Sequence, residues 1–169
     1  MAKPVYMIVA CSENRVIGRD GGLPWDLPED SAYYATMTEG GIVIEGRKVY
    51  EELGRAMPNR KTIVLTRNPE RRFPDAETAS SLGAALEMAQ HSAHPGPIWI
   101  AGGEQVYEEA MAVADKLFLT LVHDTYVGDT YFPEWDPPFS TILSKRTSSH
   151  KGVGFTFLVL EGSKPDGNE

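Results

Sequence analysis

A carboxylate and two large side chains share one face of an expected helix that begins near Pro28. Asp30, Tyr34 and Met37 follow one another at the spacing i, i+4 and i+7, which places them on the same side of a helix. The long glycine-containing segment that leads from Val16 to this helix is typical of a functional loop. A carboxylate on such a face can bind a polar ligand. In the first turn, Asp30 is equally explained by the helix dipole that it would complement.

Three junctions between an apolar run and the next segment carry groups that favour anion binding. They are Gly46 with Arg47 and Lys48, Arg67 after Thr66, and Gly102 with Gly103. Glycine lets a ligand approach the backbone closely, and arginine pairs with phosphate. Since ligands of open α/β sheets bind beyond the carboxyl ends of the strands, the three junctions together predict a phosphate-binding edge. Each junction alone is also explained by a solvated charge or an ordinary tight turn.

Apolar runs alternate along the chain with segments of helical period. We expect strands at residues 5–11, 42–44, 62–65, 98–101, 116–122 and 155–160, and helices at 29–37, 48–53, 81–90 and 104–112. In the last helix Val106, Ala110 and Val113 form the expected apolar stripe. The alternation predicts an α/β fold, a three-layer sandwich whose central, mostly parallel sheet has helices on both faces. Residues 141–147 and 155–160 follow one another without a helical pattern, which predicts an antiparallel hairpin at the C-terminal edge.

The composition is typical of one globular domain. The 169 residues are 41% hydrophobic and 24% charged, and we expect a single domain over residues 1–161 and a flexible tail at 162–169. The net charge of −8 opposes binding to nucleic acids or anionic membranes, so we expect neither as a partner. We also expect a monomer. The apolar run at 5–10 is too short for a signal peptide or a membrane span, and Cys11 is the sole cysteine. These features predict a reduced, cytoplasmic protein.

Several common catalytic motifs are absent from the sequence. No G-x-G-x-x-G follows an expected strand, and the chain has no G-x-x-x-x-G-K-[ST], H-E-x-x-H or G-x-S-x-G. His91 and His94 stand in a loop bounded by proline and glycine, where solvated side chains are the simpler explanation. We therefore predict no metal site.

Taken in order, the landmarks of the chain resemble those of the dihydrofolate reductase family from about Val5 to Glu161. The matching segments are 14–18, Leu23-Pro24-Trp25 with Leu27-Pro28 and Asp30, Gly46-Arg47, 53–58 with Arg60, 64–67, Gly102-Gly103 with Val106-Tyr107, and 128–133. Leu-Pro-Trp with a helical acid five residues after the tryptophan is specific to this pattern. The resemblance implies that the chain reduces 7,8-dihydrofolate to 5,6,7,8-tetrahydrofolate with NADPH, by hydride transfer to C6 and protonation at N5.

The resemblance implies catalytic roles for Asp30, Thr120, Trp25 and Leu23. Asp30 would accept hydrogen bonds from the 2-amino and N3 positions of the pterin, with the Thr120 hydroxyl in the same network. Burial is expected to raise the pKa of Asp30 above its reference of about 3.9. Trp25 and Leu23 would belong to a mobile loop that closes over the nicotinamide and excludes water.

The resemblance also implies two sets of binding residues. The substrate set is Ile8, Val9, Asp30, Tyr34, Leu53, Arg55, Met57, Arg60 and Thr120, in which Arg60 pairs with the glutamate carboxylate. The cofactor set is Ala10, Ile17, Gly18, Gly46, Arg47, Lys48, Val49, Leu65, Thr66, Arg67, Ala101, Gly102, Gly103, Glu104, Gln105, Val106 and Tyr107. Arg47, Thr66 and Arg67 would hold the 2′-phosphate. A cis peptide between Gly102 and Gly103 would lie beside the pyrophosphate and the nicotinamide. Plain core packing is the alternative explanation for Tyr34, Leu53 and Met57.

The sequence departs from the usual pattern of the family at five positions. Glu45 replaces an apolar residue, Val49 a threonine, Tyr50 a tryptophan, Ala101 a bulky aliphatic residue and Ser31 a leucine. A carboxylate close to a phosphate-binding edge is electrostatically unfavourable. We therefore expect Glu45 either to point away from the site or to pair with a nearby cation.

Two other functions remain open from the sequence. The reductase of riboflavin biosynthesis has the same fold and also uses NADPH, but its substrate has neither a pterin edge for Asp30 nor a glutamate tail for Arg60. A non-catalytic module that binds folate or a nucleotide is the second alternative. The intact Asp30, Trp25 and Thr120 speak against it.

Overall fold

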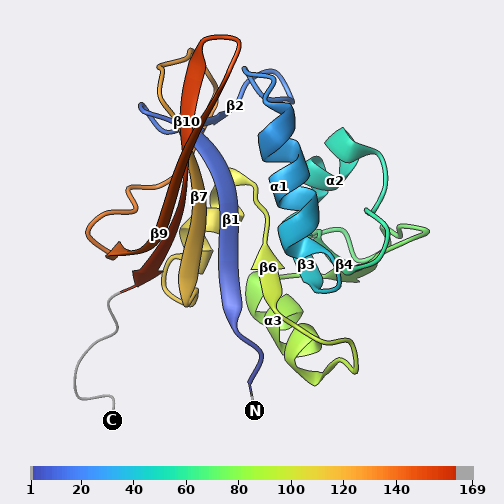
Figure 1. Ribbon diagram of the computed structural model, residues 1–169. Helices are drawn as coiled ribbons and strands as arrows, with labels where there is room; N and C mark the ends of the chain where they lie inside the picture. The colour runs from blue at the N-terminus through green and yellow to red at the C-terminus, as the bar shows by residue number, and fades with distance from the viewer. Residues whose placement is uncertain (1, 163–169) are drawn as a thin grey trace.

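One eight-stranded sheet forms the centre of the computed structural model, which describes residues 2–162 (Figure 1). Its strands lie in the order β5-β4-β3-β6-β1-β7-β10-β9. The six parallel strands are β5 (Glu77–Ala79), β4 (Lys61–Leu65), β3 (Ile42–Gly46), β6 (Ile98–Ile100), β1 (Val5–Ser12) and β7 (Lys116–Val122). Strand β10 (Val153–Gly162) runs antiparallel to β7, and β9 (Phe139–His150) runs antiparallel to β10. The predicted mostly parallel sheet with an antiparallel C-terminal edge hairpin is confirmed.

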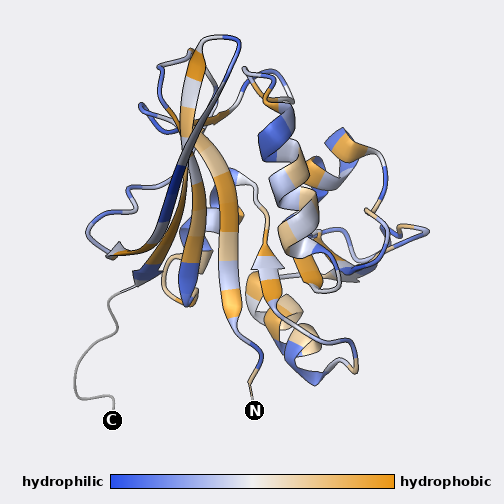
Figure 2. Cartoon of the chain, in the orientation of Figure 1, coloured by the Kyte–Doolittle hydropathy of each residue, from blue (hydrophilic) through white to orange (hydrophobic). Residues whose placement is uncertain are grey.

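The four helices of residues 2–162 cover the sheet in pairs, two on each face. On one face lie α1 (Pro28–Thr38), whose Tyr34 and Met37 pack on Val43, and α2 (Arg47–Leu53), whose Tyr50 packs on Val64. On the other lie α3 (Leu82–His91) and α4 (Glu104–Ala110), which pack on the alternate strand residues such as Ile44 and Ile63. Successive strand residues point to opposite faces, so apolar runs such as Ile42–Ile44 serve both layers. Figure 2 shows the hydrophobic residues gathered along these strands.

Local sequence signals explain where the helices begin and end. Pro28 opens α1 at a position where its missing N–H costs nothing. Ser81 caps α3, because its hydroxyl oxygen accepts a hydrogen bond of 3.1 Å from the Ala84 N–H. Gly54 ends α2 in the left-handed conformation (φ 81°) and donates its N–H to the Tyr50 carbonyl at 2.8 Å.

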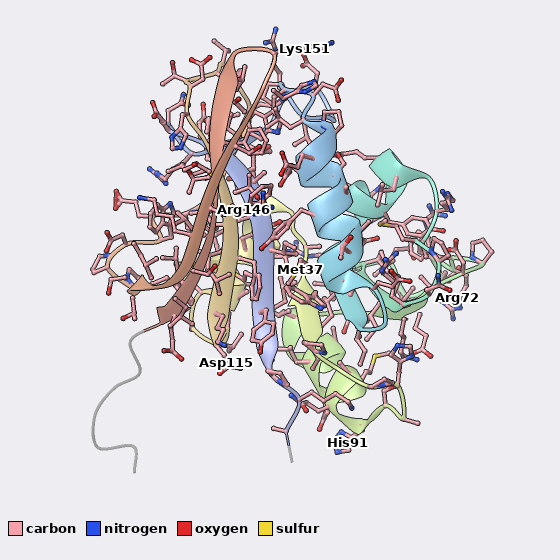
Figure 3. All side chains as sticks on the ribbon, viewed as in Figure 1. Met37, Arg72, His91, Asp115, Arg146 and Lys151 are labelled. Carbon is pink, nitrogen blue, oxygen red and sulfur yellow. The ribbon has the colours of Figure 1, made fainter. Side chains whose placement is uncertain are left out.

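The C-terminal hairpin completes the sheet and extends towards α1. Lys151 and Gly152 form its turn with φ values of 51° and 83°, the left-handed conformations that a tight hairpin turn requires. Phe157 in β10 pairs with Thr120 of β7 on one side and with Arg146 of β9 on the other. The hairpin therefore brings Arg146 to the same side of the sheet as the first turn of α1 (Figure 3).

Three short strands and two boundaries differ from the expectation. The small sheet of β2 (Val16–Gly18) and β8 (Thr130–Tyr131), and the edge strand β5, were not predicted. Helix α4 ends at Ala110, so the predicted stripe through Val113 is wrong, and that side chain is 46% exposed. Gly162 belongs to β10 rather than to the predicted tail, while residues 163–169 lie outside the described part. Within residues 2–162 no helix is long and apolar enough to cross a membrane.

Candidate active site

Asp30 lies in the first turn of α1, next to the middle of β7. Its carboxylate accepts a hydrogen bond from the hydroxyl of Thr120, which is 2% exposed. Burial raises the pKa of Asp30 above its ordinary value, and the Thr120 hydrogen bond opposes part of this rise. The predicted hydrogen-bonded pair and the predicted direction of the pKa shift are both confirmed.

The residue before Asp30 anchors α1 to the C-terminal hairpin. The Arg146 guanidinium donates a hydrogen bond of 2.8 Å to the Glu29 carboxylate, and the Ser148 hydroxyl donates another. These two hydrogen bonds lower the pKa of Glu29. The Arg146 guanidinium also lies 4.4 Å from the centre of the Phe157 ring, on which Tyr33 packs. Glu29 and Tyr33 thus fix the helix on both sides of Asp30.

In the loop before α1, Trp25 is buried and Leu23 is exposed. Trp25 is 8% exposed and packs with Leu27, Val122 and Phe155, and its ring lies 5.2 Å from that of Tyr126. The buried indole Nε1 of Trp25 donates to no described group. Leu23 is 55% exposed, so the two residues predicted to act together in a closing loop have different surroundings.

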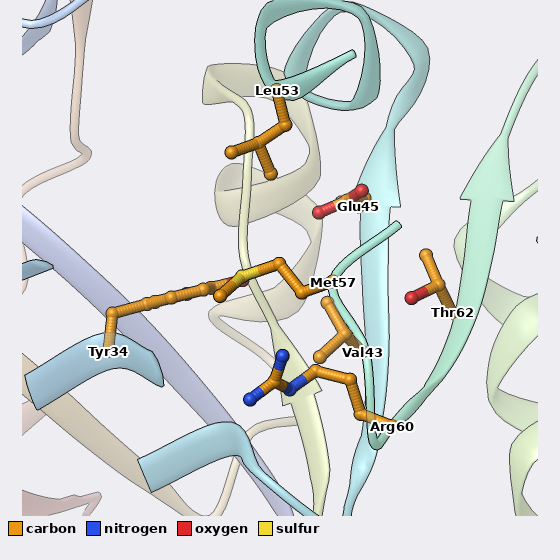
Figure 4. A pocket seen from close by; sticks show the side chains of 7 residues that line it. All are labelled: Tyr34, Val43, Glu45, Leu53, Met57, Arg60 and Thr62. Atoms are coloured by element: carbon orange, nitrogen blue, oxygen red, sulfur yellow. The ribbon is translucent and has the colours of Figure 1, made fainter. Parts of the chain in front are cut away.

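A narrow recess opens between α1, α2 and β4 on the α1 side of the sheet (Figure 4). Its lining residues are Tyr34, Val43, Glu45, Leu53, Met57, Arg60 and Thr62. Arg60 donates from Nη2 to the Ala35 carbonyl at 2.9 Å, which holds the guanidinium against the end of α1. Its Nε is buried and donates to no described group. The structure therefore brings Tyr34, Leu53, Met57 and Arg60 together as the sequence predicted.

Besides Asp30 and Thr120, three members of the predicted substrate set do not line this recess. Arg55 is exposed in the segment after α2 and is not among the lining residues. Val9 packs into the core on the α3–α4 face, so its side chain points away from α1. Ile8 lies on the α1 face with Val43, and its carbonyl accepts a hydrogen bond of 2.7 Å from the Tyr107 hydroxyl.

Three glycines meet where β3 and β6 end. The Gly46 N–H donates to the Gly102 carbonyl at 2.8 Å, and the peptide between Gly102 and Gly103 is cis. A Cβ on Gly102 would stand 3.0 Å from the Tyr107 ring, and one on Gly103 would stand 3.8 Å from Val49. The three glycines, of which Gly102 is buried and the other two are partly buried, therefore bring backbone without side chains together at the strand ends, as the sequence predicted.

Cations gather beside these glycines, on α2 and on the segment after β4. Arg47 pairs with Glu51 one turn along α2 at 2.9 Å, and Arg71 pairs with the same carboxylate at 3.4 Å. Lys48 and Arg67 are exposed and form no ion pair with a described residue. Arg71 was not predicted, because nothing in the sequence shows that the segment after Arg67 turns back towards α2.

The remaining members of the predicted cofactor set surround the glycines. Ile17, Leu65 and Val106 pack at the edge of the main core, while Ala10 and Ala101 border the clusters on the α1 face. Gly18 lies against Thr130, whose hydroxyl oxygen would be 2.3 Å from an added Cβ. Glu104 accepts a hydrogen bond of 2.7 Å from the Tyr131 N–H, and Gln105 is exposed. The Thr66 hydroxyl accepts one of 3.2 Å from the Asn68 N–H.

Comparison with known proteins shows to which family this site belongs. The family model for dihydrofolate reductase matches residues 4–161. The chain belongs to the dihydrofolate reductase family. It is 40% identical to the dihydrofolate reductase of Bacillus subtilis over 160 residues, which cover 93% of this chain and 94% of that protein. It is 38% identical to that of Neisseria gonorrhoeae over 161 residues, covering 94% and 98%. The dihydrofolate reductase of Enterococcus faecalis, solved with NADP(H) and RAB-propyl, matches with a TM-score of 0.88, 29% identity and coverage of 97% and 100%.

Membership of the dihydrofolate reductase family decides between the functions that the sequence left open. The chain is an enzyme that reduces dihydrofolate with NADPH and so belongs to tetrahydrofolate synthesis and one-carbon metabolism. The riboflavin-pathway reductase and the non-catalytic module are not favoured, because the match covers almost the whole chain.

One departure from the dihydrofolate reductase pattern lies inside the recess. Glu45 was expected to point away from the site or to pair with a cation. It is 2% exposed, lines the recess with Arg60, and forms no ion pair with a described residue. Burial raises the pKa of Glu45 to about 7, and the charge of Asp75 adds to the rise. A carboxyl that can take up a proton does not need a cation to be buried, so the predicted cation partner is not required. The recess contains none of the glycines and arginines of the predicted phosphate-binding edge, which is consistent with the other alternative, that Glu45 points away from that edge.

Proposed function

We propose that Asp30 and Thr120 bind the pterin ring of dihydrofolate. The observation that carries this proposal is the carboxylate in the first turn of α1, withdrawn from water and hydrogen-bonded to the Thr120 hydroxyl. A carboxylate there can accept hydrogen bonds from both the 2-amino group and N3 of a pterin, and Thr120 keeps it oriented. The anchoring of Glu29 to Arg146 and Ser148 holds the helix turn in place.

The charge of Asp30 also favours the positive charge that the pterin acquires during the reaction. In a site with little water, a nearby negative charge stabilises a pterin that has gained a proton at N5. Water would supply that proton, and Asp30 would act through its charge. NADPH, when bound, supplies the hydride to C6. Trp25, buried against β7 and β10, closes the loop side of the pocket, and the exposed Leu23 covers the nicotinamide when the loop closes.

The residues at the strand ends fit NADPH. Gly46, Gly102 and Gly103 leave a cradle in which backbone can meet the pyrophosphate, and side chains on α2 and after β4 supply cations. Arg47, Thr66 and Arg67 would hold the 2′-phosphate, with Lys48 nearby. The rest of the cofactor set, Ala10, Ile17, Gly18, Val49, Leu65, Ala101, Glu104, Gln105, Val106 and Tyr107, would border the nicotinamide, ribose and adenine.

The recess between α1, α2 and β4 would take the p-aminobenzoyl-glutamate end of the substrate. Tyr34, Leu53 and Met57 offer apolar walls, and Arg60 offers a guanidinium whose Nε has no partner. A substrate carboxylate can satisfy that guanidinium in a bidentate contact. Arg55, Ile8 and Val9 would act from the rim or through the backbone.

The environment and assembly of the protein belong to the same proposal. A net charge of −8 and a single, buried cysteine support a cytoplasmic monomer that binds no nucleic acid. Size-exclusion chromatography with light scattering tests the monomer, with a mass of 18.6 kDa expected.

The test of the site assignment is kinetic. Protein is mixed with NADPH and dihydrofolate, and the loss of reduced-nicotinamide absorbance is followed for the wild type and for Asp30→Asn. The wild type should turn over, and the variant should bind NADPH with unchanged affinity but lose most turnover. A variant as active as the wild type would place the pterin elsewhere.

A further inference from the structure

Glu45 is a buried acid in the recess for which the proposed roles have no use. It lies on β3 opposite Val64 of β4 and shares the α1 face of the sheet with Val43. Figure 4 shows its carboxyl group directed into the recess from the β3 side, with Tyr34 and Arg60 on the other sides. At 2% exposure it is far more buried than the acids of the protein surface.

The polar groups around this recess have few partners within the protein. The Tyr34 hydroxyl and the Glu45 carboxyl form no hydrogen bond with the described residues, and the buried Arg60 Nε also lacks one. Buried polar groups are almost always paired, so the buried and unpaired Nε of Arg60 is typical of a group that a ligand satisfies. The recess is thus prepared for a ligand group that carries both charge and hydrogen-bonding capacity.

The charged and titratable groups that line the recess with Glu45 or interact with it electrostatically come from both faces of the sheet. They are Tyr34 of α1, Tyr50 of α2, Arg60 before β4, Asp75 before β5 and Tyr107 of α4. Asp75 accepts hydrogen bonds from the Tyr50 hydroxyl and, at 2.8 Å, from the Ala56 N–H, which lower its pKa and keep it ionised. The pKa values of the three tyrosines are raised, so they stay neutral. Glu45 is the member of this set that changes charge near neutral pH.

We propose that Glu45 sets how strongly the recess binds the anionic tail of the substrate. Its carboxylate lowers the positive potential that Arg60 offers to the tail, whereas its carboxylic acid leaves that potential intact and can donate a hydrogen bond. The Tyr34 hydroxyl interacts electrostatically with both groups, since Glu45 raises the pKa of Tyr34 and Arg60 lowers it. This inference rests on the proposed binding of the glutamate tail by Arg60.

The consequence is a substrate affinity that falls as pH rises through neutrality. Below about pH 6 Glu45 is protonated and the tail meets only Arg60, while above about pH 8 the tail meets an added negative charge in a poorly hydrated recess. Asp30 also titrates, but it faces the pterin and affects substrates with and without a tail alike. The difference between two such substrates therefore isolates the recess.

The experiment compares dihydrofolate with a 7,8-dihydropterin that lacks the tail, in the presence of saturating NADPH. KM and kcat are measured between about pH 6 and pH 8.5 for the wild type, Glu45→Gln and Glu87→Gln. Glu87 lies exposed on α3, so its variant makes the same substitution of glutamine for glutamate on the opposite face of the sheet. In the wild type the KM for dihydrofolate divided by the KM for the dihydropterin should rise about three- to tenfold from the lowest to the highest pH. The kcat for dihydrofolate should change less than its KM.

Glu45→Gln should flatten this pH dependence, and Glu87→Gln should retain it. A ratio that rises equally in Glu45→Gln overturns the inference, and so does a wild-type ratio that does not change with pH. If Glu45→Gln does not fold, Glu45→Met, an apolar residue of similar length, replaces it with the same expectation. Arg60→Leu separates the two proposals: if it affects both substrates equally, the tail does not bind at Arg60 and the proposed site fails first.

Discussion

Asp30 and Glu45 are two carboxyl groups on one side of the sheet, and burial raises the pKa of each. Asp30 has the Thr120 hydroxyl as a partner, which favours its charged form. Glu45 has no such partner and faces the charge of Asp75, which favours its neutral form. Asp30 is therefore suited to bind and stabilise a protonated pterin. Glu45 instead changes its charge without forming a hydrogen bond to a described residue.

Asp30→Asn should keep the fold and lose most turnover. The amide can still form hydrogen bonds but supplies no negative charge to the protonated pterin, so transition-state stabilisation should fall by about 2–4 kcal/mol. Steady-state kinetics with NADPH and dihydrofolate measure the loss, and circular dichroism checks the fold. Kinetics within a few-fold of the wild type would contradict the role of Asp30.

Arg60→Leu should raise KM for dihydrofolate about tenfold or more while changing kcat less, because a tail remote from C6 contributes mostly uniform binding. Arg72→Leu is the matched control, since Arg72 is exposed, lies outside the recess and belongs to neither predicted binding set. The control should change KM at most a few-fold. Equal effects of the two substitutions would show that the recess does not select the tail.

At the scale of elements, the edge of the sheet where we propose that NADPH binds consists of the ends of β3, β4 and β6 and of helix α2, which follows β3. Gly46 and Gly102 are in backbone contact at this edge, and α2 begins there with Arg47. Glu51 already pairs with Arg47 and Arg71. A phosphate at this edge therefore has to compete with, or be added to, a carboxylate that the protein itself supplies.

Arg47→Leu and Arg67→Leu should each weaken NADPH binding while leaving NADH binding nearly unchanged, because only NADPH carries the 2′-phosphate. Charge-assisted hydrogen bonds are worth about 1.5–3 kcal/mol each, and the Arg47 effect should be the smaller, since Glu51 shares that guanidinium. Fluorescence titration with both cofactors measures the two dissociation constants. Equal losses for NADPH and NADH would make these arginines structural.

How much the sequence predicts also depends on the element. Strands with continuous apolar runs, such as Lys116–Val122, and capped helices, such as the one after Ser81, were predicted because local signals define them. Strands β2, β5 and β8 have only two or three residues, too few for a period to show. Asp30 was found from its helix spacing and from the family pattern. Arg71 and the direction of Glu45 depend on long-range packing, which no local pattern contains.

For the molecule as a whole, the net charge of −8 opposes the binding of two anionic ligands, NADPH and dihydrofolate. Several arginines near the proposed site counteract this charge locally. Arg60 lines the recess, and Arg47 and Arg71 lie along α2 and beside it. Glu45 is placed among these groups at the cost of a buried carboxyl. The burial of this carboxyl changes the free energy of unfolding of the protein, and the direction in which this contribution changes with pH follows from the pKa of Glu45.

Glu45→Gln should stabilise the protein at alkaline pH relative to the wild type, and less so at acidic pH. The pKa of Glu45 is 4.5 in its ordinary state and about 7 in the folded protein, so the folded state binds the proton more tightly. Its favourable contribution is therefore complete below pH 4.5 and is lost as pH rises through about 7. The loss is about 3 kcal/mol for a shift of this size, and glutamine does not undergo it. Urea denaturation of both proteins between about pH 5 and pH 8.5 gives the difference in unfolding free energy, in which the titration of Asp30 and Glu29 cancels. A difference that stays constant with pH would mean that Glu45 remains ionised, and the charge change assigned to it in the recess would then not occur.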